Sequence, residues 1–220
     1  MLMCTTPTLK RLSEIFMNQT DMKIEYEATF LDIDKGTMRQ KLAGIGARLA
    51  KPEFMQKRVV FNLPAGHEIN GGWLRVRDEQ DKITMTLKVV DGDAIENQKE
   101  IELKVDDFET AVSILETIGC KRKSYQETKR ELWIFEDVEV TIDTWPFLDP
   151  FVEIEGKDEK SVKDMARSLE LDWDKALFCS VDVIYKIKYG VPFEVVNAAP
   201  KIVFDMENPF NSYEIHPTRQ

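Results

Sequence analysis

Charged residues of one sign recur along the chain in pairs separated by a single residue. The four pairs are Glu25/Glu27, Arg75/Arg77, Glu100/Glu102 and Glu153/Glu155. Residues i and i+2 of a β-strand project on the same face, and the residues that alternate with each pair are mostly apolar. Each segment is therefore expected to form a strand with one charged face and one apolar face.

If these strands share one sheet, their charged faces suit a metal-bound polyanion. Two carboxylates about 4 Å apart repel by about 4 kcal/mol at an effective dielectric constant near ~20, so a cluster of them requires a cation. Oxygen ligands without His or Cys select hard ions such as Mg²⁺ or Mn²⁺. The planar guanidinium group of arginine can donate two parallel hydrogen bonds to a phosphate group. Any single pair could be an ordinary solvated face, but the segregation of acids and bases onto different strands favours a metal–triphosphate site.

The composition is that of an ordinary globular protein: 43% of the 220 residues are hydrophobic and 32% are charged. The formal net charge of −10 argues against non-specific binding to nucleic acid or to an anionic membrane. No apolar run reaches the ~18–20 residues of a membrane span, and the first residues make a poor signal peptide. Three widely spaced cysteines give neither a disulfide framework nor a zinc motif. We therefore expect a cytoplasmic protein.

The pattern of apolar residues predicts strands alternating with helices. Strands are expected over 23–31, 54–63, 73–77, 82–90, 99–105, 125–135, 138–143 and 151–155. Helices are expected over 34–50, 107–119, 158–169 and 175–189, with Lys51-Pro52 ending the first. Hairpins indicate antiparallel pairing, so the expected fold class is α+β: a closed or nearly closed eight-stranded antiparallel barrel with a charged interior and helices on its outside.

Three regions are expected along the chain. Residues 1–21 are expected to be a flexible N-terminal extension, and residues 22–189 the barrel domain. Residues 190–220 contain four prolines and scattered charges without clear periodicity, and are expected to be a tail.

Taken in order, the charged motifs resemble those of the CYTH superfamily, the triphosphate tunnel metalloenzymes, over about residues 23–189. The family's E-x-E-x-K, R-x-R, following lysine, middle E-x-E, aspartate and F-x-E-I-E correspond to Glu25–Thr29, Arg75–Arg77, Lys88, Glu100–Glu102, Asp143 and Phe151–Glu155. Each motif is weak alone, but their common order and spacing make the resemblance specific to the fold.

The resemblance implies an eight-stranded tunnel that holds one or two divalent ions, Mg²⁺ or Mn²⁺, and a triphosphate or nucleotide. The implied metal ligands are Glu25, Glu27, Asp143, Glu153 and Glu155. The implied phosphate-binding residues are Arg75, Arg77, Lys88 and Arg130, braced by Glu100 and Glu102. We expect catalysis to depend on Glu25, Glu27, Lys88 and Arg58.

Two positions depart from the family pattern. Thr29 stands where the family has a lysine expected to contact phosphate or activate the attacking group. The family's K-x-R reads Thr128-Lys129-Arg130, so Lys129 is displaced by one residue and should point away from the tunnel if Arg130 points in. Either Lys57 or Arg58 of the strand over 54–63 should face inward and compensate. Arg58 is favoured, because it shares a strand face with Gln56 and Val60.

Three functions remain open at this point. The first is metal-dependent hydrolysis of an inorganic or organic triphosphate, and the second is class IV adenylyl cyclase activity, in which the ribose hydroxyl of ATP displaces pyrophosphate. The third is a module that binds a phosphorylated ligand without turnover, because Thr29 replaces the lysine. A structural domain without a ligand is the remaining alternative. No nucleic-acid or membrane partner is expected, and the sequence leaves homodimer formation open.

Overall fold

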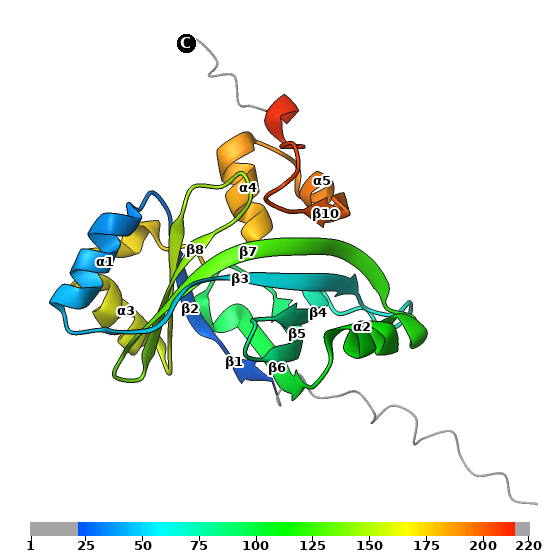
Figure 1. Cartoon of the computed structure of the whole chain (residues 1–220), viewed down its shortest axis with the longest axis horizontal. Helices are drawn as coiled ribbons and strands as arrows, with labels where there is room; N and C mark the ends of the chain where they lie inside the picture. The colour runs from blue at the N-terminus through cyan, green and yellow to red at the C-terminus, as the bar shows by residue number, and fades with distance from the viewer. Residues whose placement is uncertain (1–21, 214–220) are drawn as a thin grey trace, which may run out of the picture.

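The computed structural model describes residues 22–213, so the extension expected at residues 1–21 lies outside the described residues. One antiparallel sheet dominates the structure (Figure 1). Its strands are β1 (Lys23–Ile24), β2 (Tyr26–Phe30), β3 (Arg48–Asn62), β4 (Gly72–Asp78), β5 (Ile83–Val90), β6 (Gln98–Val105), β7 (Lys121–Phe135), β8 (Val138–Thr144) and β9 (Phe151–Gly156). They are ordered β1-β6-β5-β4-β3-β7-β8-β9-β2 across the sheet.

The first strand segment joins the two edges of this sheet. β1 pairs with β6 at one edge, and β2 pairs with β9 at the other. Between them, Glu25 donates its backbone N–H to the Gln98 carbonyl at 2.9 Å. With β1 and β2 counted as one interrupted strand, the result is an eight-stranded, nearly closed antiparallel barrel, which confirms the predicted fold class.

Helices cover the outer face of the barrel, where the strands present their apolar side chains. These are α1 (Lys35–Gly44), α2 (Phe108–Thr117), α3 (Glu159–Ser168), α4 (Val181–Tyr189) and α5 (Phe193–Ala198). Val162 of α3 packs with Ile154 of β9, and Phe108 of α2 packs with Val76 of β4. Figure 1 shows α1 and α3 together at one end of the barrel and α2 at the other. Within residues 22–213, no helix combines the length and apolar character needed to cross a membrane.

The first helix is shorter than predicted. The apolar spacing predicted a helix to residue 50, but α1 ends at Gly44 and β3 begins at Arg48. Gly46 has a φ of 82°, a left-handed conformation that suits glycine and ends the helix. Pro52 therefore ends no helix. It lies within β3, next to the register shift that follows Lys51, where an irregular ladder tolerates a residue without an N–H donor.

The last predicted helix also begins later than expected, at Val181 rather than near residue 175. Residues just before it extend the barrel instead. Leu177 exchanges two backbone hydrogen bonds of 2.9 Å with Thr29 of β2. The edge of β2 that does not face β9 is therefore paired at Thr29 with the extended segment that precedes α4.

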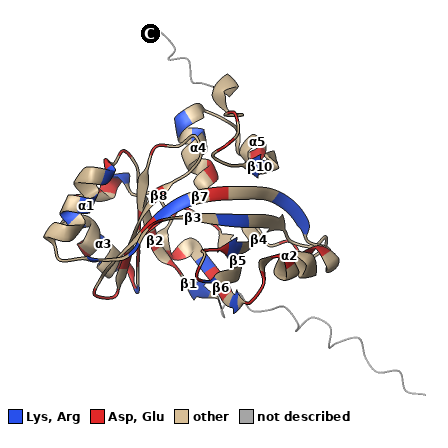
Figure 2. Ribbon diagram, viewed as in Figure 1, with Lys and Arg blue, Asp and Glu red and all other residues tan. Residues whose placement is uncertain are grey.

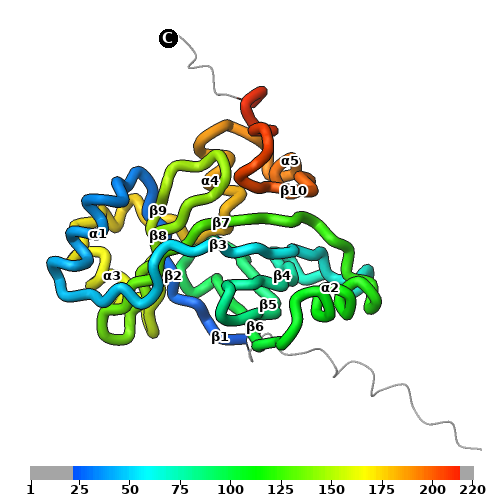
Figure 3. The backbone as a smooth tube through the Cα atoms, viewed as in Figure 1, coloured from blue at the N-terminus to red at the C-terminus, as the bar shows by residue number. Residues whose placement is uncertain are grey.

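The part of the expected tail up to residue 213 is folded against the barrel. α5 is followed by β10 (Lys201–Ile202), which pairs in parallel with β7 at Tyr125 and Gln126. Phe210 is buried in a cluster with Tyr185 and other residues of α4. Figure 3 shows this segment running beside β7. Short elements such as α5 carry too few residues for periodicity to reveal them.

Candidate functional site

A cavity of about 750 Å³ lies inside the barrel and is lined by residues from β1 to β9. Its size falls within the ~300–1,000 Å³ that small-molecule sites occupy. Among the sequence-predicted site residues, the lining includes Glu25, Glu27, Arg58, Arg75, Arg77, Lys88, Glu100, Glu102, Arg130, Glu153 and Glu155. Asp143 does not belong to this lining. Figure 2 shows that charged residues lie along the strands as well as on the helices.

Carboxylates occupy one side of the cavity, on β2, β9 and β8. Glu27 lies directly opposite Glu155 in the β2–β9 ladder, and Glu155 lies opposite Glu139 in the β8–β9 ladder. Burial, followed by the charges of Glu27 and Glu25, raises the pKa of Glu155 to about 7. Burial also raises the pKa of Glu27 and outweighs the opposing charge of Lys88. Like charges placed opposite each other are unfavourable, so this side of the cavity favours a cation.

Arg130 of β7 connects the carboxylates to one another. Its Nη2 donates to Glu153 Oε2 at 2.5 Å and to Asp143 Oδ2, and its Nε donates to Asp143 Oδ1 at 2.8 Å. Burial disfavours the charge of Arg130, but Asp143 and Glu153 outweigh it and raise its pKa well above the usual value. Burial and then Glu27 and Asp143 raise the pKa of Glu153 well above its usual value. The Arg130 guanidinium therefore pairs with two carboxylates that lie close to each other.

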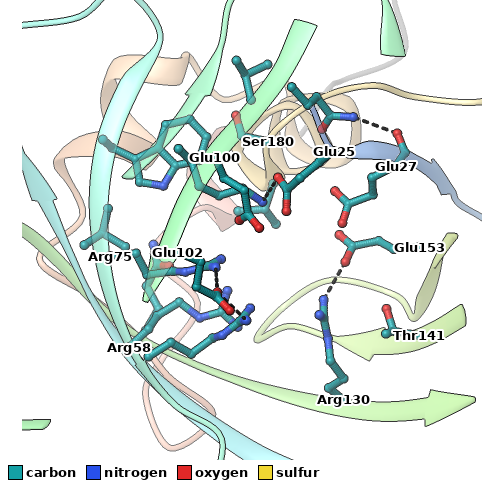
Figure 4. Close-up of a pocket in the computed structure, with 18 of the residues that line it drawn as sticks. Glu25, Glu27, Arg58, Arg75, Glu100, Glu102, Arg130, Thr141, Glu153 and Ser180 are labelled. Atoms are coloured by element: carbon teal, nitrogen blue, oxygen red, sulfur yellow. Dashed lines mark hydrogen bonds and ion pairs between the residues drawn. The ribbon is translucent and has the colours of Figure 1, made fainter. Parts of the chain in front are cut away.

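Three arginines line the side contributed by β3 and β4. Arg58 and Arg77 are direct partners across the β3–β4 ladder, and Arg75 lies two residues from Arg77 on the same face. Figure 4 shows Glu25, Glu27 and Glu153 facing Arg58 and Arg75 across the cavity. The barrel interior is therefore divided into an acidic side and a basic side.

Two acids hold Arg75 and Arg77 in place. Arg77 Nη2 lies 2.6 Å from Glu79 Oε1 and 3.8 Å from Glu102 Oε2. Arg75 Nη2 lies 3.9 Å from Glu102, which also accepts a hydrogen bond of 3.1 Å from Thr86 Oγ1. Glu102 therefore lies beside both arginines, and its bracing role stays a prediction. Glu79 lies just beyond β4, two residues after Arg77, so the same alternation continued by one step could have indicated it.

Arg58 has only neutral hydrogen-bond partners among the described residues. Its Nη2 donates to Gln56 Oε1 at 2.9 Å and to Thr128 Oγ1 at 2.5 Å. Its guanidinium carbon lies 4.7 Å from the centre of the Trp145 ring. Only 6% of the residue is exposed. A buried cation without a carboxylate partner is costly, so this position indicates an anionic ligand.

The other arginine atoms indicate the same need. Nε of Arg58, Arg75 and Arg77 is buried and lacks a hydrogen-bond partner within residues 22–213. Burial, followed by the charges of Arg77 and Arg75, lowers the pKa of Arg58 well below its usual value. Burial and then Arg77 lower the pKa of Arg75 to about 10. An anion beside these guanidinium groups would supply the missing negative charge.

Lys88 lies on β5 beside two carboxyl groups of unequal pKa. Its Nζ is 2.7 Å from Glu25 Oε2. Burial acts to raise the pKa of Glu25, but Lys88 and a hydrogen bond with Glu100 outweigh it and lower the pKa to about 2. Burial and then Glu25 raise the pKa of Glu100 to about 8. At neutral pH, Glu100 therefore carries a proton that it donates to the Glu25 carboxylate.

The two departures from the family pattern are visible in the structure. Thr29 is buried and does not line the cavity, although it lies opposite Glu153 in the β2–β9 ladder. Lys129 Nζ lies 5.0 Å from the centre of the Phe204 ring and is likewise absent from the lining, whereas Arg130 faces the cavity. As predicted, the displaced lysine points away from the interior. Arg58 does line the cavity, and its compensating role stays a prediction.

Several lining residues were not anticipated from the sequence. They are Glu79, Lys123, Ser124, Gln126, Glu139, Thr141, Trp145 and residues 179–182, 196 and 197. Strand alternation could have indicated Glu139 and Thr141, which share a face of β8. No local pattern indicates that α4 and α5 reach the cavity, because their position depends on packing against β7 and on the pairing of β10.

The acidic side fits a divalent ion in its chemistry. All of its donors are carboxylate oxygens, the ligands of Mg²⁺ and Mn²⁺, and crowding already raises the pKa of Glu27, Glu153 and Glu155. No group of three or more carboxylates within residues 22–213 is arranged to hold an ion directly. Asp143 stays a prediction as a ligand, since both of its oxygens accept hydrogen bonds from Arg130.

Comparison with known families agrees with this arrangement. The CYTH domain model matches residues 23–182. The chain belongs to the CYTH family. The protein named "Putative adenylate cyclase MJ0240" from Methanocaldococcus jannaschii is 30% identical over 170 residues, which cover 76% of this chain and 96% of that protein.

Solved structures share the fold of this CYTH protein. The PH1012 protein of Pyrococcus horikoshii superposes with a TM-score of 0.58 at 24% identity, covering 69% of this chain and 93% of that one. A protein of Vibrio parahaemolyticus, titled "putative adenylate cyclase", gives a TM-score of 0.63 at 13% identity, covering 74% of this chain and 97% of that one. At these identities the likeness concerns the fold alone.

The raised pKa of Glu100 predicts a pH dependence of stability in the ligand-free protein. The folded state binds a proton on Glu100 up to about pH 8, whereas the unfolded chain releases it near the ordinary value of 4.5. The unfolded state thus binds fewer protons in this window, and the contribution of Glu100 to stability is lost as pH rises through it. Glu100→Gln, which mimics the protonated acid, should therefore gain stability over the unmodified protein from about pH 4.5 to 8.

The measurement is the free energy of unfolding by urea at several pH values, with EDTA present. The exposed Glu109→Gln of α2 serves as the control. The free energies of unfolding of Glu100→Gln and the unmodified protein are compared between about pH 4.5 and 8. A difference that stays constant over this range would contradict the raised pKa of Glu100.

Proposed function

We propose that this CYTH protein is a divalent-metal-dependent enzyme that hydrolyses a triphosphate inside the barrel. Family membership supports this class of substrate, and enzymes of the family are typically triphosphatases that use divalent metals. The single observation that carries the proposal is Arg58, a buried guanidinium without a carboxylate partner among the described residues, next to Arg75 and Arg77. These arginines require an anion of high charge density, while the facing carboxylates require a cation.

The basic side would bind and orient the phosphate chain. Arg58, Arg75 and Arg77 present guanidinium groups from two neighbouring strands, which suits the oxygens of successive phosphates. Lys88 adds a positive charge near Glu25. In phosphoryl transfer, positioning and neutralisation of charge in the transition state supply most of the acceleration. The rigid strands keep these groups in place, because Glu79 and Glu102 hold the arginine side chains.

The acidic side would hold the metal. Mg²⁺ or Mn²⁺ held by Glu27 and Glu155, which lie opposite each other in the β2–β9 ladder, would supply Lewis-acid stabilisation of phosphate charge. Burial raises the pKa of Glu27, and the positive charge of a bound ion would favour its ionised form. Burial disfavours the charge of Lys88, but Glu25 and Glu27 outweigh it and raise the pKa of Lys88, so this side chain stays charged for the phosphate.

Formation of cyclic AMP from ATP is the second candidate function. The similarity to a protein named as an adenylate cyclase favours it. The same phosphate cradle would serve, but the nucleophile would be the ribose hydroxyl and pyrophosphate would leave. Thr29, in place of the family lysine, supports a third reading, in which the triphosphate binds without turnover.

A substrate screen separates these functions. Tripolyphosphate, ATP and thiamine triphosphate are each incubated with Mg²⁺ or Mn²⁺, and phosphate, pyrophosphate and cyclic AMP are measured. The proposal predicts release of phosphate that stops with EDTA and falls at least ~100-fold in Glu27→Gln. The exposed Glu109→Gln should keep the full rate. Cyclic AMP as the main product would indicate cyclase activity. Tight binding without any product would contradict the proposal that the protein is an enzyme.

Arg58 is expected to lower the stability of the ligand-free protein and to strengthen the binding of triphosphate. Arg58→Met removes a buried, unpaired charge while keeping an apolar stem beside Trp145, so the ligand-free protein should unfold at a higher temperature. The same variant should bind tripolyphosphate with Mg²⁺ at least ~10-fold more weakly, because a charge-assisted hydrogen bond contributes about 1.5–3 kcal/mol. Calorimetric titration and thermal unfolding measure the two effects.

Lys129→Met is the matched control for this experiment. It removes one positive charge from a side chain that points away from the cavity, and so should leave tripolyphosphate affinity within about twofold. Unchanged affinity in Arg58→Met would show that Arg58 does not bind the phosphates.

A further inference from the structure

Arg58 is held differently from the other arginines that line the cavity. Arg75, Arg77 and Arg130 each have a carboxylate oxygen near a guanidinium nitrogen, at 3.9, 2.6 and 2.5 Å respectively. The partners of Arg58 within residues 22–213 are uncharged, and we call them the neutral cage: Gln56, Thr128 and Trp145. The neutral cage therefore fixes a cation without balancing its charge.

Two residues on neighbouring strands form the hydrogen-bonding part of the neutral cage. Gln56 and Thr128 are direct partners in the β3–β7 ladder. Arg58 Nη2 donates to Gln56 Oε1 at 2.9 Å and to Thr128 Oγ1 at 2.5 Å, and Thr128 Oγ1 donates to Gln56 Oε1 at 3.1 Å. Both hydrogen bonds of the guanidinium use Nη2, which leaves the two N–H groups of Nη1 for a ligand.

Trp145 is the aromatic part of the neutral cage. The centre of its ring lies 4.7 Å from the guanidinium carbon of Arg58, within the ~6 Å range of a cation–π interaction. Trp145 begins the connection between β8 and β9, and the hydroxyl of Tyr185 in α4 donates to the carbonyl of Pro146 at 2.7 Å. Tyr185 is fully buried. Trp145 is therefore held over Arg58 by a connection that is anchored to α4.

Packing alone does not explain a glutamine at position 56. A guanidinium only donates hydrogen bonds, so Gln56 must direct its amide oxygen towards Arg58. Its Nε2 is buried and lacks a partner within residues 22–213, which costs stability that a methionine of similar size would not lose. A glutamate of the same shape would instead pair with Arg58. Of the three side chains, only glutamine accepts a hydrogen bond from Arg58 and leaves its charge unbalanced.

We propose that Gln56, Thr128 and Trp145 are positioning residues for phosphate binding, which orient the Arg58 guanidinium without neutralising it. A fixed cation without a carboxylate partner attracts a phosphate more strongly than a cation that is already paired. Arg58 is therefore the arginine of the cavity that gains most from a bound phosphate. This inference rests on the proposed function, because it requires a phosphate group to bind at Arg58.

Gln56→Glu tests the neutral character of the cage, because it replaces an amide by a carboxylate of the same shape. The carboxylate should pair with Arg58, so the ligand-free protein should unfold at a higher temperature. The same pairing should weaken the binding of tripolyphosphate at least ~10-fold. The affinity is measured by calorimetric titration with Mg²⁺, using tripolyphosphate with methylene groups in place of both bridging oxygens, which prevents hydrolysis.

Opposite changes in stability and affinity are the signature of this role, because a residue that only fills space would not produce them. Gln40→Glu is the matched control. It adds the same charge at an exposed position of α1 and should leave the affinity within about twofold. A Gln56→Glu protein that binds as tightly as the unmodified protein, or that loses stability together with affinity, would overturn the inference.

Gln56→Met tests whether Gln56 acts through Arg58. It removes the acceptor at a similar volume and should weaken the binding of the same ligand at least ~5-fold. In Arg58→Met, which lacks the guanidinium, the further change Gln56→Met should leave the affinity within about twofold. Equal losses in the two backgrounds would contradict the inference. Thr128→Val takes the place of Gln56→Met in this cycle if thermal unfolding shows that the latter is misfolded.

A third pair of variants tests the aromatic part of the cage. Trp145→Leu should weaken the binding of the same ligand, and Trp145→Phe, which keeps an aromatic face for the cation, should restore most of the affinity. Equal affinities of these two variants would contradict a positioning role for Trp145.

The outcomes separate this inference from the proposed function. If Arg58→Met binds the ligand weakly but the variants of the neutral cage bind it as the unmodified protein does, the inference fails, although the triphosphate site stands. If the unmodified protein does not bind the ligand with Mg²⁺ or Mn²⁺, the proposed function fails and this inference fails with it.

Discussion

The burial of unbalanced charge inside the barrel is the constraint on which the rest of the structure depends. Arg58 and Arg77 face each other across β3 and β4, while Glu27 and Glu155 face each other across β2 and β9. Glu79 and Glu102 balance only part of the arginine charge, and Arg130 and Lys23 balance only part of the carboxylate charge. Arg58 has only neutral hydrogen-bond partners among the described residues. Such an arrangement is stable only because strong packing elsewhere compensates for it. It is useful only if a ligand brings charges of both signs.

The architecture follows from this interior. Because the inward faces are charged, the apolar faces of the strands point outward and require helices to cover them, which is the reverse of an ordinary small barrel. The segment around Glu25 joins both edges of the sheet and brings the acidic strands round to the basic ones. The same closure places Glu25 beside Lys88 and Glu100, which outweigh burial and lower the pKa of Glu25 to about 2.

Alternation along the strands made most of the site predictable, because a residue pair at i and i+2 fixes which face carries the charge. Arg58 could be placed inward on the same ground. Longer-range geometry could not be predicted. Both oxygens of Asp143 are taken up by Arg130, which depends on the β7–β8 register. Pro52 looked like a helix stop but lies at an irregular point of β3. The contribution of α5 depends on tertiary packing, which leaves no local pattern.

The most direct test of the central claim is a crystal structure of the protein with Mn²⁺ and tripolyphosphate. The anomalous signal of manganese should appear inside the barrel beside Glu27 and Glu155, with phosphate oxygens within hydrogen-bond distance of Arg58 and Arg77. Phosphate and manganese bound only on the outer surface, with the barrel interior filled by water, would contradict it.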